Sequence, residues 1–198
     1  MAVLPRSLKG SFKTMSTQQP ASAYFLEDNK DPIEKHTLSI VVDNEPGVLA
    51  RVIGLFSGRG YNIESLTVSE TEHEAHVSRI TIVTSGTAEV LVQIKAQLER
   101  MVPVHSVADL TVIGEAIERE LALIKVAGEG EHRMEALRLA DAFRARVVDV
   151  TQNSFVFEIT GKSRKVEQFI SLMQPIGLTE VVRTGVTAIS RGPEALRV

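Results

Sequence analysis

The sequence predicts an α+β protein made of two consecutive ferredoxin-like βαββαβ domains. Between residues 36 and 114 the hydrophobic pattern indicates strand, helix, strand, strand, helix, strand, which is the order of this fold. The same order recurs between residues 118 and 198. Hydrophobic residues make up 43% of the 198 residues and charged residues 24%, values typical of a globular chain. We therefore expect a disordered tail over 1–35, a first domain over 36–114 and a second domain over 118–198.

The first predicted domain begins with a strand over Thr37–Asp43, in which apolar residues alternate. A helix follows, because apolar residues then recur at helical spacing, and Pro46 suits its first turn, where a missing N–H costs nothing. Gly58 and Gly60 end this helix, since glycine readily takes the left-handed backbone of a helix terminus. The remaining elements are two strands joined as a hairpin, a second helix and a closing strand, at 62–70, 76–84, 88–101 and 102–112.

The second predicted domain repeats the architecture without repeating the sequence. Phe155, Phe157 and Ile159 alternate along one strand and are expected to point into the core. The predicted elements are a strand, a helix, two hairpin strands, a helix and a final strand, at 120–128, 132–145, 146–152, 154–161, 165–173 and 177–190. Each domain is expected to have a four-stranded antiparallel sheet with two helices on one face.

Composition and charge exclude several classes of partner and chemistry. A net charge of −3 and a pI near 6.0 give no general attraction to phosphates, so we expect no nucleic acid and no anionic membrane as partner. The absence of cysteine removes disulfides, thiolate metal sites and cysteine nucleophiles, and fits a reducing compartment. No apolar run reaches the length of a membrane span.

The first 35 residues show neither helical nor strand periodicity. Arg6, Lys9 and Lys13 precede the first acidic residue, Glu27, a pattern that weakly resembles a transit peptide. A disordered extension is the simpler interpretation. Met15 is an alternative start of the chain.

The ferredoxin-like fold also occurs in RNA-binding domains and in acyl-phosphate hydrolases, so the fold does not decide the function. RNA binding needs aromatic side chains on the middle strands, and the strand over 76–84 has none. The hydrolase needs an arginine in the first turn of the helix, whereas Arg51 lies a full turn further on and the neighbouring acidic residues repel a phosphoryl group.

A metal site at His73 and His76 is a further alternative, because Glu70, Glu72 and Glu74 lie nearby. The segment is predicted to be a turn, which gives these side chains no fixed ligand face. We expect a solvated loop and no metal.

Two polar corners flank the first helix. A helix start collects unpaired N–H groups and a partial positive charge, so it binds anions such as a carboxylate. Gly47 allows close approach, and the amide of Asn44 is placed either to cap the helix or to contact an amino acid. Asn62, at the start of the next strand, supplies a second amide. Small apolar residues nearby suit a branched aliphatic side chain, namely Val48, Leu49 and Ile63. Each feature is also ordinary helix-terminus chemistry.

The run NEPGVLARVIGLFSGRGYNIESL closely resembles the amino-terminal ACT domain of the small regulatory subunit of acetohydroxyacid synthase, also called acetolactate synthase. The resemblance continues through SRITIVTSG, ERELALIKV, VVDVT and RTGVTAISRG, and it covers about His36 to Gly192. It implies an ACT domain over 36–114 for effector binding and dimerisation, followed by an ACT-like regulatory domain over 118–198.

The resemblance implies a chain without catalytic residues, metal or cofactor of its own. Its partner in the family is a catalytic large subunit that uses thiamine diphosphate, Mg²⁺ and FAD to make acetolactate in branched-chain amino acid biosynthesis. The small subunit raises that activity and confers feedback inhibition by valine, in a cytoplasmic, bacterial-type enzyme. A freestanding amino-acid sensor that acts on a transporter or a transcription factor is the alternative.

Carried over by position, the resemblance implies an effector site between two chains of a homodimer. Its residues are Asn44, Pro46, Gly47, Val48, Leu49, Asn62 and Ile63. A sheet of order 4-1-3-2 leaves the second strand at an edge, where two such strands can pair. Pairing brings each Asn62 near the start of the partner's first helix.

Overall fold

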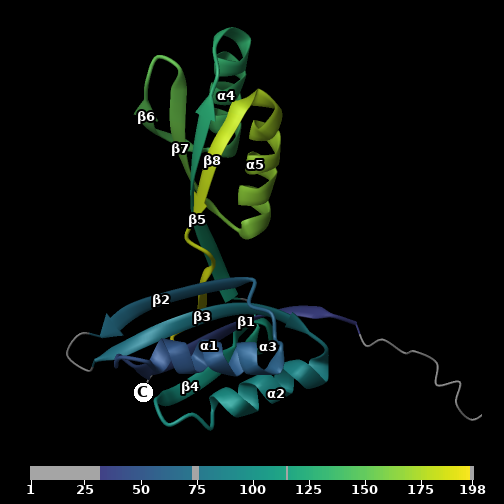
Figure 1. Ribbon diagram of the computed structural model, residues 1–198, viewed down its shortest axis with the longest axis vertical. Helices are drawn as coiled ribbons and strands as arrows, with labels where there is room; N and C mark the ends of the chain where they lie inside the picture. Colours follow the sequence, from purple (N-terminus) through teal and green to yellow (C-terminus); the bar gives the residue numbers. More distant parts are fainter. Residues whose placement is uncertain (1–31, 73–75, 115, 197–198) are drawn as a thin grey trace, which may run out of the picture. The chain divides into compact units, whose positions relative to one another are not determined.

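The computed structural model describes residues 32–72, 76–114 and 116–196, and it contains two sheets, each with helices on one face (Figure 1). The first sheet has the strand order β2-β3-β1-β4 and the second β6-β7-β5-β8, with β9 paired to β5. Both follow the βαββαβ order, so the predicted α+β fold is confirmed. The predicted tail up to residue 31 and His73, in the loop that was weighed as a metal site and expected to be solvated, lie outside the described residues.

The elements of the first half are β1 (Glu34–Asp43), α1 (Val48–Arg59), β2 (Ser65–Glu72), β3 (Val77–Gly86), α2 (Ala88–Leu98), β4 (Val104–Asp109) and α3 (Leu110–Ile113). Those of the second half are β5 (Ala116–Ala127), α4 (Gly130–Phe143), β6 (Arg146–Val150), β7 (Ser154–Gly161), α5 (Ser163–Gly177), β8 (Leu178–Arg183) and β9 (Thr187–Ser190).

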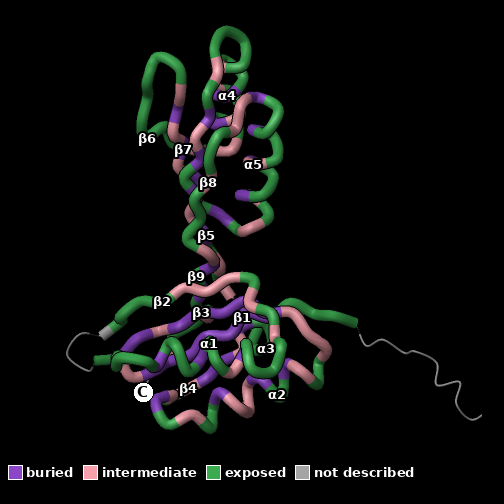
Figure 2. Tube along the Cα trace, viewed as in Figure 1, coloured by how far each residue is buried: buried purple, intermediate pink, exposed green. Residues whose placement is uncertain are grey.

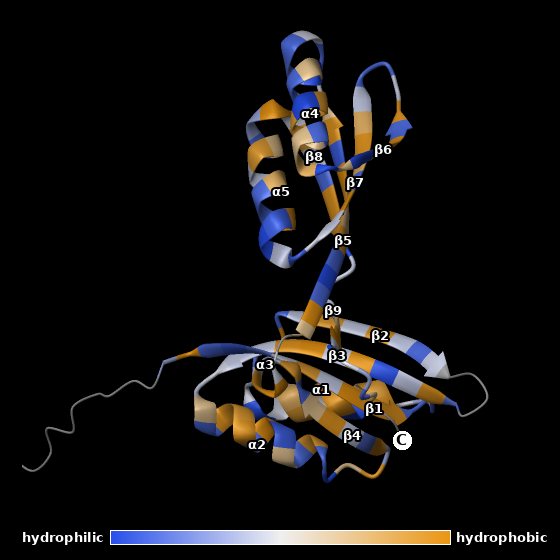
Figure 3. Cartoon of the chain, turned by 180° about the vertical axis from the view of Figure 1, so that it is seen from behind, coloured by the Kyte–Doolittle hydropathy of each residue, from blue (hydrophilic) through white to orange (hydrophobic). Residues whose placement is uncertain are grey.

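Each sheet buries one face against its two long helices (Figure 2). In the first core, side chains that alternate along β1 and β3, such as Leu38 and Ile82, pack against Phe56 of α1 and Leu98 of α2. In the second core, Phe155, Phe157 and Ile159 are buried as predicted. Helix α5 alternates hydrophobic and hydrophilic residues, because only one side of it meets the sheet (Figure 3).

Several predicted strands are wrong in their extent, among them the last strand of each domain. The strand predicted over 102–112 ends at Asp109, whose carboxylate accepts the N–H of Thr111 at 3.0 Å and caps the short helix α3. The strand predicted over 177–190 is split into β8 and β9. Gly185 lies at the break with φ +84°, a left-handed conformation that interrupts the extended backbone.

The chain after β8 covers the face of the first sheet that the helices leave open. Along β4, Val107 points to the helices, and its neighbour Ala108 points the other way and packs with Leu110 and Ala188 of β9. The guanidinium of Arg79 on β3 donates to the carbonyl of Leu196 at 3.2 Å. The first sheet of this protein is therefore covered on both faces, by helices on one and by the chain after β8 on the other.

A buried ion pair joins the neighbouring strands β1 and β4 of this half. The Nδ1 atom of His36 lies 2.5 Å from the carboxylate of Asp109, and its Nε2 atom lies 3.4 Å from Glu34. Burial lowers the pKa of His36, but the hydrogen bonds and negative charges of Asp109 and Glu34 outweigh burial and raise the pKa above its ordinary value. The imidazolium form is thus favoured in the folded state.

This pair makes stability depend on pH. Because the folded pKa of His36 lies above the unfolded value of 6.5, the pair stabilises fully below pH 6.5 and loses this contribution as the pH rises through the raised pKa. We expect His36→Gln to lower the free energy of unfolding by about 1–3 kcal/mol at acidic pH and by less at alkaline pH, measured in urea. The exposed pair His105–Asp43 is the control, and His105→Gln should cost little at either pH. An equal cost of His36→Gln at both pH values would contradict this role.

Candidate functional site

The predicted effector corner lies where β1 turns into α1. Pro46 and Gly47 form a turn, and Gly47 is the residue that precedes the helix, with φ +89°. Pro46 was predicted in the first helical turn and instead lies before it. No side chain caps α1, so the amide of Asn44 does not cap the helix. Asn44 is held by its own N–H, which donates to the carbonyl of His76 at 2.6 Å, and its side chain is exposed.

The first turn of α1 presents backbone rather than side chains at this corner. Val48 is 3% exposed and belongs to the core, so its side chain does not supply the predicted apolar contact, and its N–H donates to the carbonyl of Glu45 at 3.3 Å. Leu49 is 37% exposed and remains available. A Cβ added at Gly47 meets no atom within 4 Å, so the space beside these N–H groups is open. An open, uncapped helix start suits a carboxylate.

Asn62 and Ile63 lie at the other end of α1, ahead of β2. Gly60 ends the helix in a left-handed conformation with φ +70°. The carbonyl of Asn62 accepts the hydroxyl of Thr84 at 2.6 Å, which fixes the backbone while the side chain is exposed. Ile63 is half-buried against the first core. The loop is therefore a fixed support for an outward amide.

One chain does not bring the two corners together. Helix α1 has 12 residues and rises 1.5 Å per residue, so Gly47 and Gly60 are separated by roughly 18 Å. A free valine is far shorter than this distance. The interpretation that Asn44 and Asn62 line one pocket is therefore excluded within a single chain.

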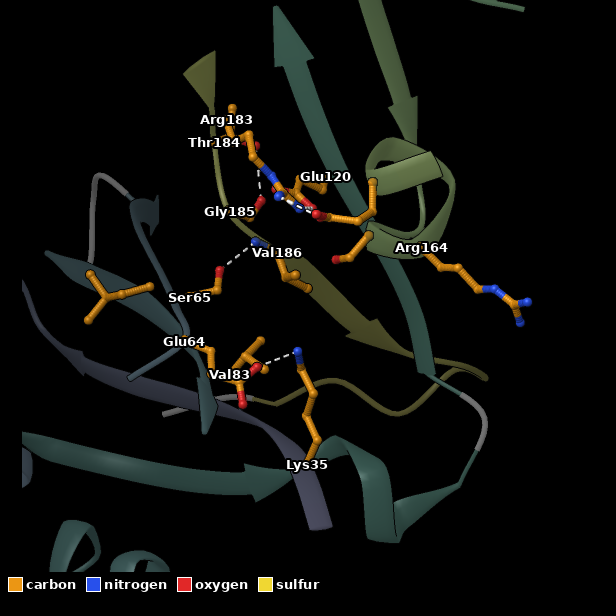
Figure 4. A pocket seen from close by; sticks show the side chains of 13 residues that line it. Lys35, Glu64, Ser65, Val83, Glu120, Arg164, Arg183, Thr184, Gly185 and Val186 are labelled. Atoms are coloured by element: carbon orange, nitrogen blue, oxygen red, sulfur yellow. Dashed lines mark hydrogen bonds and ion pairs between the residues drawn. The ribbon is translucent and has the colours of Figure 1, made fainter. Parts of the chain in front are cut away.

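A cavity of about 640 Å³ lies beside the start of β2 (Figure 4). Its charged groups are largely paired with one another: Lys35 with Glu64, and Arg183 with Glu120 and Glu167. The hydrogen bond from Lys35 lowers the pKa of Glu64, and the one from Arg183 lowers the pKa of Glu120, so these acids stay ionised.

Sequence reasoning missed the residues that bind the chain after β8 to β2. Ser65 and Thr67 are small polar residues of a predicted strand, and Gly185 and Val186 were placed inside another. Glycine within a strand pattern signals a break or a close backbone approach, and Gly185 carried that signal.

Among the described residues, no three His, Asp or Glu side chains gather closely enough to hold a metal ion. No helix in the same part of the chain is long and apolar enough to cross a membrane.

Comparison with known proteins identifies relatives over both halves. A family model described as the AHAS small subunit-like ACT domain matches residues 38–106, and one described as the small subunit of acetolactate synthase matches residues 119–192. The probable acetolactate synthase small subunit of Archaeoglobus fulgidus is 48% identical over 158 residues, which are 80% of this chain and 98% of that protein. The isozyme 3 small subunit of Escherichia coli is 42% identical over 164 residues, which are 82% of this chain and 99% of that one.

A solved structure agrees with these sequence matches. The crystal structure of the acetolactate synthase small subunit from Thermotoga maritima superposes with a TM-score of 0.74 at 37% identity. The match covers 81% of this chain and 99% of that one. Fold, sequence and both family models thus agree over the two sheets. The chain belongs to the acetolactate synthase small subunit family.

Proposed function

We propose that this chain is the regulatory subunit of an acetolactate (acetohydroxyacid) synthase, which raises the activity of a catalytic large subunit and makes that activity sensitive to valine. The observation that carries the proposal is the open helix start at Gly47 in a chain of this family. The catalytic subunit, with thiamine diphosphate, Mg²⁺ and FAD, performs the chemistry, and this chain contributes regulation.

The effector site is completed by a second copy of the chain. Strand β2 is at the edge of its sheet, and Val68 in its middle is 43% exposed. If two copies pair antiparallel through β2, Asn62 ahead of one strand lies beside the far end of the other, where His76 and Asn44 of the same chain are joined. The roughly 18 Å separation within one chain is thereby bridged between two chains.

Valine fits this composite site group by group. The carboxylate accepts N–H groups at the start of α1, beside Gly47. The amides of Asn44 and of the partner copy's equivalent of Asn62 contact the ammonium and carboxylate groups, because an amide both donates and accepts. Leu49 and the partner copy's equivalent of Ile63 provide apolar contact for the isopropyl group.

Reconstitution tests the proposal. The purified chain should show no turnover alone, should raise acetolactate formation when mixed with its cognate catalytic subunit, and should make that rate fall when valine is added. An unchanged rate and an unchanged valine response would exclude the function. Valine binding without any effect on the synthase would instead indicate a freestanding amino-acid sensor, whose partner a pull-down would retain in place of the large subunit.

Asn62→Ala tests the amide at the second corner. The change should weaken valine binding by about 1–3 kcal/mol in calorimetry, because polar groups of the ligand are left unpaired. Activation of the catalytic subunit should persist, since Asn62 is held by its backbone carbonyl and its exposed side chain supports no core contact. Loss of activation together with valine binding would show that Asn62 serves the fold or the subunit interface.

A further inference from the structure

The chain that leaves β8 is fastened to β2 by two hydrogen bonds of opposite direction. Figure 4 shows the one between Val186 and Ser65. The N–H of Val186 donates to the hydroxyl of Ser65 at 2.8 Å. The hydroxyl of Thr67 donates to the carbonyl of Val186 at 2.9 Å. We call Ser65, Thr67, Gly185 and Val186 the clasp. It fixes one peptide segment against the side chains of one strand.

Gly185 makes this approach sterically allowed. Its φ is +84°, and a Cβ added there would lie 2.7 Å from the hydroxyl oxygen of Ser65 and 3.3 Å from a methyl carbon of Thr67. Any other residue would displace the hydroxyl of Ser65 or push the segment away from β2. Gly192 provides a contrast, because its φ is +92° and an added Cβ would meet nothing within 4 Å.

The same segment is also hydrogen-bonded to the second sheet and its helix α5. The guanidinium of Arg183 donates to both carboxylate oxygens of Glu120 on β5, at 2.6 and 2.9 Å, and to Glu167 of α5 at 2.9 Å. Glu120 is 4% exposed, so this is a shielded, bidentate pair. The next residue, Thr184, exchanges hydrogen bonds with the backbone of Leu121. Arg183 and Thr184 thus tie this short segment of chain to β5 and α5.

The clasp lies where the predicted effector site would act. Strand β2 begins directly after Asn62 and Ile63, and the N–H of Glu64 already donates to β3 at 2.8 Å. The same strand is the proposed pairing edge between copies. A ligand that contacts both Asn62 and a partner copy would thus shift the strand that carries Ser65 and Thr67.

We infer that the clasp is the link that couples the effector site on β2 to the second sheet, so that valine binding is converted into a change in the second domain. The inference rests on the proposed function. A coupling of about 5- to 150-fold in affinity is usual for allosteric proteins, and a chain of hydrogen bonds between two secondary-structure elements is a suitable carrier.

The test separates valine binding from valine response. The double variant Ser65→Ala/Thr67→Val removes both hydroxyls with little change in volume. Reconstituted with the catalytic subunit, it should activate as the unaltered chain does and bind valine unchanged in calorimetry. Its half-inhibitory valine concentration should rise at least about fivefold. The single variant Thr67→Ser, which keeps a hydroxyl at this position, should retain most of the valine response.

Gly185→Ala should give the same uncoupling, whereas Gly192→Ala, with comparable backbone strain and no clash, should respond normally. Circular dichroism during heating verifies that each variant is folded. Normal valine inhibition of the folded double variant would overturn the clasp and leave the proposed function intact, and so would equal defects in the two glycine variants. Failure of the unaltered chain to confer any valine response would overturn the proposed function itself.

Discussion

Gly47→Asp is expected to abolish valine inhibition while activation of the catalytic subunit persists. The new carboxylate enters the open space beside the first N–H groups of α1, where we place the carboxylate of valine. It satisfies those N–H groups itself and repels the ligand, so valine binding should weaken by about 3 kcal/mol or more, over a hundredfold. Calorimetry with valine and inhibition curves of the reconstituted enzyme measure the two effects.

Gly47→Asn is the matched control for this charge effect. Asparagine has nearly the shape of aspartate and tolerates the left-handed backbone that Gly47 adopts at φ +89°. It should weaken valine binding far less than Asp does. Equal losses in the two variants would mean that bulk or backbone strain acts at this corner, and that the negative charge is irrelevant.

Gly177→Ala is expected to be the most destabilising small substitution in the second half. Gly177 ends α5 with φ +119°, and a Cβ there would lie 2.0 Å from the carbonyl oxygen of Ala127. Because the added Cβ has no side-chain torsion to rotate away and its neighbour is a backbone carbonyl, the clash is relieved only by moving α5 or β5. We expect a loss of about 3–5 kcal/mol in the free energy of unfolding, measured with urea.

Gly114→Ala separates the clash from the backbone conformation. Its φ of +133° is close to that of Gly177, but an added Cβ meets nothing within 4 Å. The cost should be limited to backbone strain, about 1–2 kcal/mol. If Gly114→Ala is as damaging as Gly177→Ala, the contact with Ala127 is unimportant and the conformation alone demands glycine.

The fold could be predicted because periodicity survives in both halves. Alternation at Phe155, Phe157 and Ile159 marked a strand with one buried face, and that prediction is confirmed. Buried faces leave such patterns because a shift of one residue would turn every apolar side chain toward water. The break at Gly185 left a weaker signal, a single glycine between Thr184 and Val186, within a stretch that otherwise resembled one continuous strand.

The candidate site was predictable only in pieces. Asn44, Gly47 and Asn62 were proposed because they lie at the two ends of the first helix, and the family resemblance placed the effector site between two chains. The helix between them has a fixed rise, and it holds the corners roughly 18 Å apart in one chain. Local sequence patterns could not predict the clasp, because Ser65 and Val186, which are hydrogen-bonded, are 121 positions apart in the sequence.

The chain after β8, which covers the open face of the first sheet, also determines when that sheet can complete its folding during synthesis. Ala108 is translated 79 residues before Thr187, the first residue of the segment that shields it, Thr187–Ser190. At roughly 5–20 residues per second, a nascent chain waits several seconds with that layer bare. The first domain therefore reaches its final form only after the second has been synthesised. A chain that lacks the segment after β8 should be recognised by chaperones and proteases instead of assembling with the catalytic subunit.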